Sequence, residues 1–234
     1  MLGSREEIEA NLHAIGSRIA AAASRAGRDP GEVLLVGAAK TVPAEAVGWA
    51  VQAGLRAVGE NYVQELREKR PTLDDATPDR RVRWHYIGTL RSGTAHHVAD
   101  LADVVETVAG ERAARRLAGR AARAGRVLDV FLEVDFTGER SGIAPDDVAT
   151  AAAMVAELEG LRLRGLMTIP PVTSTAEGAR TWFARLREQR ERLRTTFPDV
   201  LDLSMGMSLD YDVAIEEGAT IVRIGTALFG PRTA

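Results

Sequence analysis

Apolar runs typical of buried strands alternate with helical segments along nearly the whole 234-residue chain. Eight such runs are present, at residues 33–40, 55–59, 82–88, 103–108, 127–134, 161–169, 200–204 and 220–224. Strands that alternate with helices pair in parallel through right-handed crossovers, and eight of them close a barrel. The alternation therefore predicts an α/β fold, a single (β/α)8 barrel of the TIM type. An open doubly wound sheet is the competing topology, but no Gly-rich dinucleotide fingerprint follows the first run.

The start of the chain predicts one helix more than a barrel needs. A capping box runs from Ser4 to Glu7, and the apolar spacing behind it indicates a helix over residues 4–26. The barrel itself is expected over residues 33–230. Because no linker-like or low-complexity stretch interrupts residues 1–234, we expect a single domain.

Two later helix boundaries are also predicted. Pro71 is expected to end the helix that starts at Asn61, which leaves residues 71–81 as a polar surface loop. Ser208 is expected to cap a helix that ends at Gly218, because serine is a favoured N-cap residue and glycine a favoured helix stop.

Composition excludes several classes of function. The net charge of −3 gives no polyelectrolyte signature, so we expect no nucleic-acid partner. The absence of cysteine excludes disulfides and thiolate metal sites, and His96 and His97 have no third ligand at metal spacing. The N-terminus is acidic and amphipathic, unlike a signal peptide, and no apolar run approaches the roughly 20 residues that span a bilayer. We therefore expect a cytoplasmic protein that binds no metal and no membrane.

Lysine occurs only twice in the chain, at Lys40 and Lys69, against 28 arginines. Lys40 ends the first apolar run, at the edge where barrels place their sites. Its primary amine can lose a proton and form an imine with a carbonyl, which a guanidinium cannot do. Lys40 is therefore a candidate for covalent attachment of a carbonyl compound. The alternative is a lysine that extends from a strand end into solvent.

The loops after the last two predicted strands are rich in glycine and hydroxyl groups. Ser204 and Gly206 come at the end of the seventh strand, and Gly225 and Thr226 follow the eighth. Barrels commonly bind phosphate in these two loops, because glycine lets the backbone approach a ligand and free N–H groups hold its charge. Together the loops predict a phosphate site, whereas each glycine alone is typical of an ordinary turn.

Arg223 lies inside the eighth apolar run, between Val222 and Ile224. Alternation along a strand places Arg223 on the side opposite to its two neighbours, inside the barrel. A buried arginine needs a partner, which is either a ligand or a carboxylate of a buried ion pair. The candidate carboxylates are Glu133, Asp135 and Asp202.

An imine-forming lysine, a phosphate site and a buried cation together suit a phosphorylated aldehyde lying across the barrel mouth. A cofactor-free Schiff-base aldolase acting on a sugar phosphate fits the same groups. The chain resembles the pyridoxal phosphate homeostasis protein family over residues 5–230. The segments that carry the resemblance are VLLVGAAKTVPAEAV, VGENYVQEL, WHYIGTL, TGERSGI, LRLRGLMTIPP and LSMGMSLDYDVAIEEGATIVRIGTALFG.

The resemblance implies a barrel similar to the N-terminal domain of alanine racemase, with pyridoxal 5'-phosphate (PLP) held as an internal aldimine on Lys40. It implies a monomer that carries and buffers PLP, maintains vitamin B6 and amino-acid homeostasis, serves apo-enzymes that need PLP and has no established turnover. The residues that it assigns to the cofactor are Lys40, Asn61 beside the ring, Arg223 at the pyridine nitrogen, and Ser204, Gly206, Gly225 and Thr226 at the phosphate.

A PLP-dependent racemase or lyase acting through the same aldimine is the alternative function. Racemisation needs a second acid–base group, which alanine racemase supplies as a tyrosine from a further domain. Tyr62, Tyr86 and Tyr211 are the candidates in this chain, and each also fits a position in the core or at the rim. An arginine at the ring nitrogen donates a hydrogen bond and leaves the ring a weaker electron sink, which argues against such chemistry.

Three positions depart from the family pattern. Ala39 stands where a serine usually precedes the lysine, and Gly93 with Thr94 replaces an Asn–Lys pair. Arg140 replaces a lysine found in some relatives. This last change removes a second amine for cofactor transfer.

Overall fold

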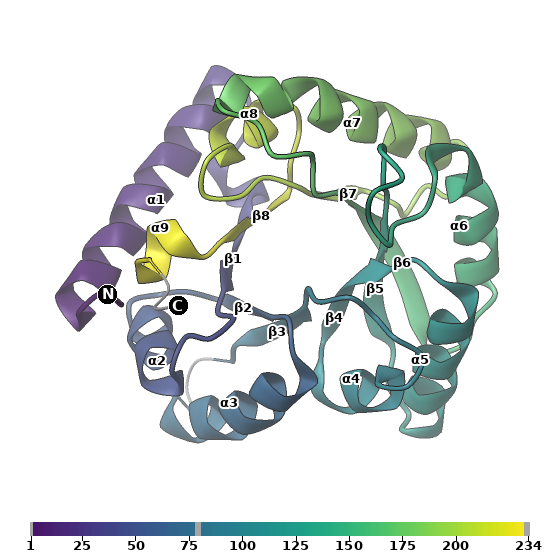
Figure 1. Cartoon of the computed structure of the whole chain (residues 1–234), viewed down its shortest axis with the longest axis horizontal. Coiled ribbons are helices and arrows are strands. Elements are labelled where there is room, and N and C mark those ends of the chain that lie inside the picture. The colour runs from purple at the N-terminus through teal and green to yellow at the C-terminus, as the bar shows by residue number, and fades with distance from the viewer. Residues whose placement is uncertain (1, 78–80, 232–234) are drawn as a thin grey trace.

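The computed structural model describes residues 2–77 and 81–231 of the chain. Eight parallel strands form one closed barrel in chain order, with β8 hydrogen-bonded back to β1 (Figure 1). This closure confirms the predicted barrel and excludes the open sheet. The strands are β1 Leu34–Ala38, β2 Ala57–Glu60, β3 Arg83–Tyr86, β4 Val104–Val108, β5 Leu128–Glu133, β6 Leu161–Met167, β7 Asp202–Ser204 and β8 Ile221–Ile224.

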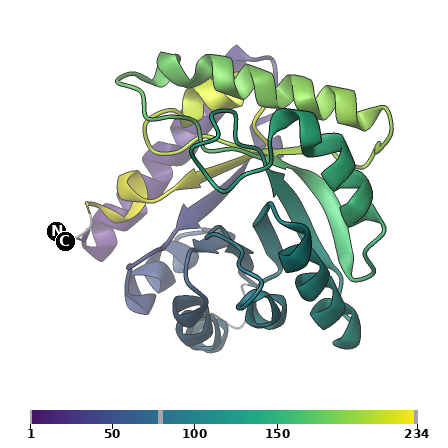
Figure 2. The same cartoon turned by 45° about the vertical axis from the view of Figure 1, so that its right-hand side comes forward.

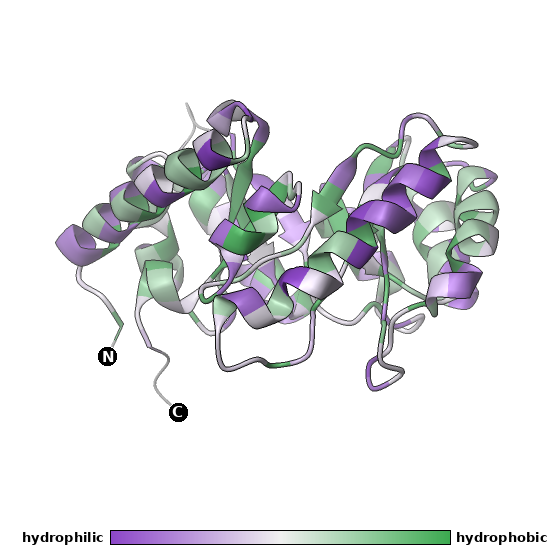
Figure 3. Cartoon of the chain, turned by 90° about the horizontal axis from the view of Figure 1, so that it is seen from above, coloured by the Kyte–Doolittle hydropathy of each residue, from purple (hydrophilic) through white to green (hydrophobic). Residues whose placement is uncertain are grey.

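Helices surround the outside of the barrel, as the two views in Figures 1 and 2 show. Hydrophilic and hydrophobic residues both occur along them (Figure 3), as amphipathic packing on a sheet requires. The helices are α1 Arg5–Arg25, α2 Ala44–Gln52, α3 Val63–Ala76, α4 Ala95–Leu101, α5 Glu111–Arg123, α6 Val148–Ala156, α7 Arg180–Arg194, α8 Tyr211–Glu216 and α9 Thr226–Phe229. Single 3₁₀ turns are present at Pro30–Glu32, Pro145–Asp147 and Ala176–Ala179.

Helix α1 is the predicted extra helix, and it covers the seam where β1 and β8 close the barrel. The predicted capping box is present, with the Ser4 and Glu7 side chains each accepting the other residue's backbone N–H. The helix contacts α2, α8 and α9. The N–H of Gly3 donates to the carbonyl of Phe229 over 2.9 Å, so the two ends of the described chain lie side by side.

Apolar side chains fill two layers. The larger cluster lies between the strands and the helices, and both Val222 and Ile224 belong to it. A smaller cluster lies inside the barrel, where Val36 of β1 opposes Arg223 of β8. The alternation that placed Arg223 inside the barrel is therefore confirmed. The interior cluster consists of Val36, Ala57, Val104, Phe131, Met167 and Ile221.

The prediction that Pro71 ends a helix is wrong, because α3 continues through Pro71 to Ala76. Pro71 is exposed, so its missing N–H and the displaced carbonyl can meet solvent. The turn beyond it is held by burial of Leu73, whose carbonyl accepts bonds from the N–H and hydroxyl of Thr77. Residues 78–80 of the predicted loop lie outside the described residues.

The prediction that Ser208 caps a helix is also wrong. Helix α8 begins at Tyr211, with Asp210 at the N-cap position. The Ser208 hydroxyl instead accepts the backbone N–H of Ala227 over 3.2 Å, and so joins the loop after β7 to α9. Within the described part of the chain, no helix is long and apolar enough to cross a membrane.

Candidate cofactor-binding site

The C-terminal ends of β7, β8 and β1 lie next to one another at the barrel mouth. Strand β1 pairs with β8 in a register that sets Gly37 opposite Ile224, so Lys40 and Gly225 both follow these partners at the same edge. On the other side of β8, the N–H of Arg223 donates to the carbonyl of Gly206 over 3.0 Å. Parallel pairing therefore brings the lysine and both predicted phosphate loops together.

Lys40 is half-buried in a turn directly after β1. Its Nζ lies 5.1 Å from the centre of the Tyr62 ring, and Tyr62 comes from the loop after β2. No carboxylate oxygen of the described residues forms an ion pair with this amine. Contact with an aromatic ring in place of a carboxylate leaves the amine available to a ligand.

The two loops after β7 and β8 present free backbone donors. Gly206 has φ +94°, and a Cβ there would lie 2.6 Å from the Cβ of Ala214, so only glycine fits this close approach to α8. Among residues 2–77 and 81–231, nothing accepts the backbone N–H groups of Ser208, Gly225 and Thr226. Unpaired amide donors of this kind suit an anion.

One acidic side chain belongs to the same loop. Asp210 is buried, and its carboxylate accepts the N–H of Met207 over 2.7 Å. Burial raises the pKa of Asp210, while the Met207 amide and Arg223 act in the opposite direction. Asp210 thus occupies the Met207 donor and leaves the Ser208 donor free.

Arg223 is the central cation of the barrel interior and is 4 % exposed. Its guanidinium donates to the Ser204 hydroxyl over 2.5 Å and to the carbonyl of Thr168 over 2.9 Å. The carboxylate that it pairs with is Glu106, at 3.7 Å. The sequence-based candidates for this ion pair were wrong, because Asp135 binds the loop of residues 137–140, Asp202 pairs with Arg164, and Glu133 forms no ion pair with Arg223.

Glu106 links two sides of the barrel. One carboxylate oxygen lies 2.5 Å from Nδ1 of His85, and the other accepts the Ser204 hydroxyl over 2.6 Å. Burial opposes ionisation of Glu106, but His85, Arg223 and Ser204 together hold its pKa below the ordinary value. A chain of buried polar contacts thus runs from His85 through Glu106 and Ser204 to Arg223.

Ser204 therefore lies inside the barrel, with its hydroxyl engaged by Glu106 and Arg223. The serine beside the free amides is Ser208, which the sequence predicts as a helix cap and not as a phosphate-binding side chain. Thr226 is exposed at the rim and Gly225 is half-buried. A second serine in the same glycine-containing loop was the available signal for Ser208.

Asn61 directly follows β2 and is half-buried. The backbone of Asn61 packs closely on Gly88. A Cβ added to Gly88 would lie 2.0 Å from the carbonyl oxygen of Asn61. Of the three candidate tyrosines, Tyr62 alone has a contact with Lys40 among the described residues. Tyr86 donates to the carbonyl of Thr89, and buried Tyr211 lies under Arg18 on the helix side of the barrel.

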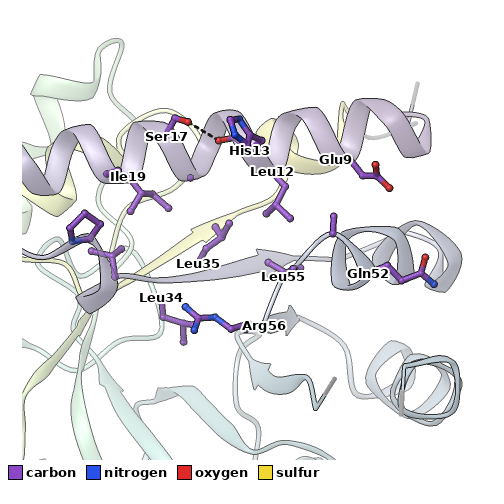
Figure 4. A pocket seen from close by; sticks show the side chains of 16 residues that line it. Glu9, Leu12, His13, Ser17, Ile19, Leu34, Leu35, Gln52, Leu55 and Arg56 are labelled. Carbon is purple, nitrogen blue, oxygen red and sulfur yellow. Dashed lines mark hydrogen bonds between the residues drawn. The ribbon is translucent and has the colours of Figure 1, made fainter. Parts of the chain in front are cut away.

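A histidine pair and two cavities lie elsewhere on the barrel or at its rim. The rings of His96 and His97 are in contact at an interplanar angle of 40°, and no group of three metal-binding side chains occurs in the described ranges. A cavity of about 840 Å³ lies outside the barrel between α1 and the start of β1, with Leu12, Leu35 and Leu55 on its walls (Figure 4). A rim pocket of about 330 Å³ is closer to the mouth and includes Arg140, Met207 and Asp210.

Comparison with known proteins agrees with this architecture. The family model described as alanine racemase, N-terminal domain, matches residues 10–233. A pyridoxal phosphate homeostasis protein of Pseudomonas aeruginosa is 43% identical over 227 residues, covering 96% of each chain. A protein of the same name from Vibrio alginolyticus is 40% identical over 96% of this chain and 97% of the relative.

A solved structure gives the same result. PipY of Synechococcus elongatus, determined with PLP bound, superposes with a TM-score of 0.81 at 34% identity, over 92% of this chain and 100% of PipY. The family match, the identity over nearly the full length and the common barrel lead to one assignment. The chain belongs to the alanine racemase N-terminal domain family and, within it, to the pyridoxal phosphate homeostasis proteins.

Proposed function

We propose that this chain binds PLP through Lys40 and carries and buffers the cofactor, maintaining vitamin B6 and amino-acid homeostasis. In this proposal the whole chain is one PLP-binding domain that acts as a cytoplasmic monomer and supplies apo-enzymes. The observation that carries the proposal is the strand register, which sets a lysine amine and two loops with free amide donors on adjacent strand ends. An aldehyde that also bears a phosphate is the ligand class that such a pair fits.

The available groups match the parts of PLP one by one. Lys40 would supply the amine for the aldehyde, and Asn61 would lie beside the ring. The free amides of Ser208, Gly225 and Thr226, with the close backbone approach at Gly206, would hold the phosphate. Since the Ser204 hydroxyl already has two protein partners, the proposal gives its phosphate contact to Ser208.

Arg223 would face the pyridine nitrogen. Its guanidinium remains protonated and can only donate a hydrogen bond, so it leaves the nitrogen without a proton. Bound PLP supplies an aldehyde and a ring that can accept electrons, and a ring without that proton accepts them poorly. The anchoring of Arg223 by Ser204, Thr168 and Glu106 fixes this donor in place, which supports carriage over turnover.

Absorption spectroscopy tests the proposal. The purified chain is incubated with excess PLP, desalted and scanned in the visible range before and after borohydride reduction. We expect a yellow protein whose visible band is bleached by borohydride, and no band in Lys40→Ala. Arg67→Ala, on the exposed outer side of α3, serves as a control that should remain yellow. A colourless wild-type protein would contradict the proposal.

A racemase or lyase is the second candidate, and one observation favours it. The Tyr62 ring lies next to the Lys40 amine at the barrel mouth, where a second acid–base group would be needed. Deuterium exchange at the α-carbon of alanine or serine in heavy water separates the two functions. Exchange by the loaded protein that is lost in both Lys40→Ala and Tyr62→Phe would support the enzyme, and its absence in the wild type would support the carrier.

A further inference from the structure

The second lysine of the chain is buried beside the first. Lys69 of α3 is 6 % exposed, and its ammonium has three acceptors. They are the carboxylate of Glu60 at 2.7 Å, the carboxylate of Glu65 at 2.6 Å and the backbone carbonyl of Ala39 at 2.8 Å. Three acceptors use all three N–H bonds of an ammonium, so no donor remains for another partner.

Ala39 is the first residue of the turn that contains Lys40. Its carbonyl also accepts the N–H of Val42 over 2.9 Å, which closes a four-residue turn with Lys40 and Thr41 at the centre. Thr41 has φ +61° and is the sole non-glycine residue in the left-handed region within the described ranges. A β-branched residue adopts this conformation only where its surroundings hold it there.

The same cluster holds the other side of the turn. The carboxylate oxygen of Glu65 that accepts Lys69 also accepts the backbone N–H of Thr41 over 2.8 Å. Lys69 and Glu65 lie four residues apart on α3, so one helix face reaches both peptide groups that flank Lys40. The Thr41 hydroxyl adds a bond of 2.6 Å to the carbonyl of Lys40.

Burial of the cluster changes the protonation of one of its carboxylates, Glu60. Glu60 is fully buried at the end of β2, and one of its carboxylate oxygens has no partner within the described residues. Burial raises the pKa of Glu60 to about 7, with Lys69 acting in the opposite direction. A Glu60 that binds a proton near neutral pH leaves one cation, Lys69, facing one carboxylate, Glu65.

We propose that Lys69, together with Glu60 and Glu65, is a positioning residue that fixes the turn carrying Lys40, and that Lys69 is not itself a cofactor-binding amine. The proposal rests on the proposed function of Lys40. Its physical basis is preorganisation. The Lys40 amine is presented in a single backbone geometry because Lys69 and Glu65 hold the peptide groups before and after Lys40. Loss of the cluster should therefore slow covalent loading of a chain that is still folded.

The test compares loading rates of matched variants on α3. Lys69→Met removes the contact to Ala39, and Arg67→Met is the control on the exposed side of the same helix. Each variant is mixed with PLP, quenched with borohydride at intervals and measured by mass spectrometry. We expect Lys69→Met to load Lys40 at least about tenfold more slowly, since small misplacements of a reacting group cost rates of this order. The Arg67→Met rate should equal that of the wild type.

A second pair of variants covers the case in which Lys69→Met does not fold. Glu65→Ala removes the acceptor of the Thr41 N–H, and Glu68→Ala removes an exposed carboxylate from the same helix. Amide hydrogen exchange of Thr41 should be slow in the wild type and in Glu68→Ala, and faster in Glu65→Ala. This measurement needs no cofactor, so it tests the cluster even if wild-type protein takes up no PLP and the proposed function fails.

Three results would overturn the inference. These are wild-type loading by folded Lys69→Met, unchanged Thr41 exchange in Glu65→Ala, and a borohydride-stable adduct on Lys69. A purely structural role for Lys69 would lower thermal stability while the folded fraction still loaded at the wild-type rate.

Discussion

The ammonium of Lys69 lies 2.8 Å from the carbonyl oxygen of Ala39, the residue before Lys40. The two lysines of the chain thus meet at one turn and differ in surroundings. Lys69 is enclosed by two carboxylates and a carbonyl, whereas Lys40 lies over the Tyr62 ring. Only the second environment leaves an amine free for an aldehyde.

The pH dependence of stability should carry a contribution from Glu60. Burial raises the pKa of Glu60 to about 7 from 4.5, so between these values the folded state holds a proton that the unfolded state has lost. The free energy of unfolding should fall as pH rises through this window and level off above it. Relative to Glu60→Gln, the wild type should lose up to about 3 kcal/mol between pH 4.5 and 7 in urea titrations. A flat difference would show that Glu60 ionises normally.

The two serines after β7 should behave differently when changed to alanine. Ser204→Ala leaves Glu106 and Arg223 without a shared partner, so it should lower the free energy of unfolding by about 1–3 kcal/mol. Ser208→Ala loses the bond from the Ala227 N–H, so it should cost less, about 0.5–1 kcal/mol, and it should weaken PLP binding by roughly tenfold through loss of a phosphate contact. Titration with pyridoxal, which lacks the phosphate, is the control and should show no effect of Ser208→Ala. If Ser204→Ala weakened PLP binding and Ser208→Ala mainly lowered stability, the phosphate contact would belong to Ser204 and not to Ser208.

Gly206 should tolerate alanine less well than Gly218, although both have positive φ, at +94° and +98°. A Cβ at Gly206 would lie 2.6 Å from Ala214, whereas the nearest atom at Gly218 is 3.7 Å away. Gly218→Ala should cost about 1 kcal/mol from backbone strain alone. Gly206→Ala should cost about 2–4 kcal/mol because steric overlap is added. Equal losses in chemical denaturation would mean that α8 moves aside.

Glu106→Gln should destabilise the barrel strongly. It removes the carboxylate that His85, Ser204 and Arg223 share, and leaves Arg223 buried without a counter-charge. Breaking such a buried group typically costs about 3–5 kcal/mol. Glu111→Gln, at an exposed pair with Arg115, should change the free energy of unfolding by less than about 0.5 kcal/mol. A small loss in Glu106→Gln would mean that Arg223 has another effective counter-charge.

The barrel could be predicted from the sequence because strand and helix periods alternate eight times, and no long-range information is needed to count them. The path of α3 could not be predicted. Pro71 is a strong local stop signal, and only the burial of Leu73 against the rest of the fold outweighs it. The burial of Lys69 could not be predicted either, since it shares a buried face with Leu66 and Leu73 in a helix that is polar overall.

The site was predictable where one strand defines it. Alternation around Arg223 predicts its inward direction, and parallel pairing of β1 with β8 places Lys40 and Gly225 at the same edge of the barrel. The partner of Arg223 was not predictable from spacing, because Glu106 comes from β4, and its bond to Ser204 spans 98 residues. A glutamate inside the apolar run 103–108 was the same kind of signal as the arginine inside 220–224, and pairing the two would have found it.

Peptide mapping after borohydride reduction of PLP-loaded protein tests the role of Lys40 most directly. The chain has two lysines, so the reduced adduct can form on only two side-chain amines. The account predicts one adduct per chain, on the peptide that contains Lys40, and an unmodified Lys69. An adduct on Lys69, or loaded protein with no adduct on either lysine, would contradict it.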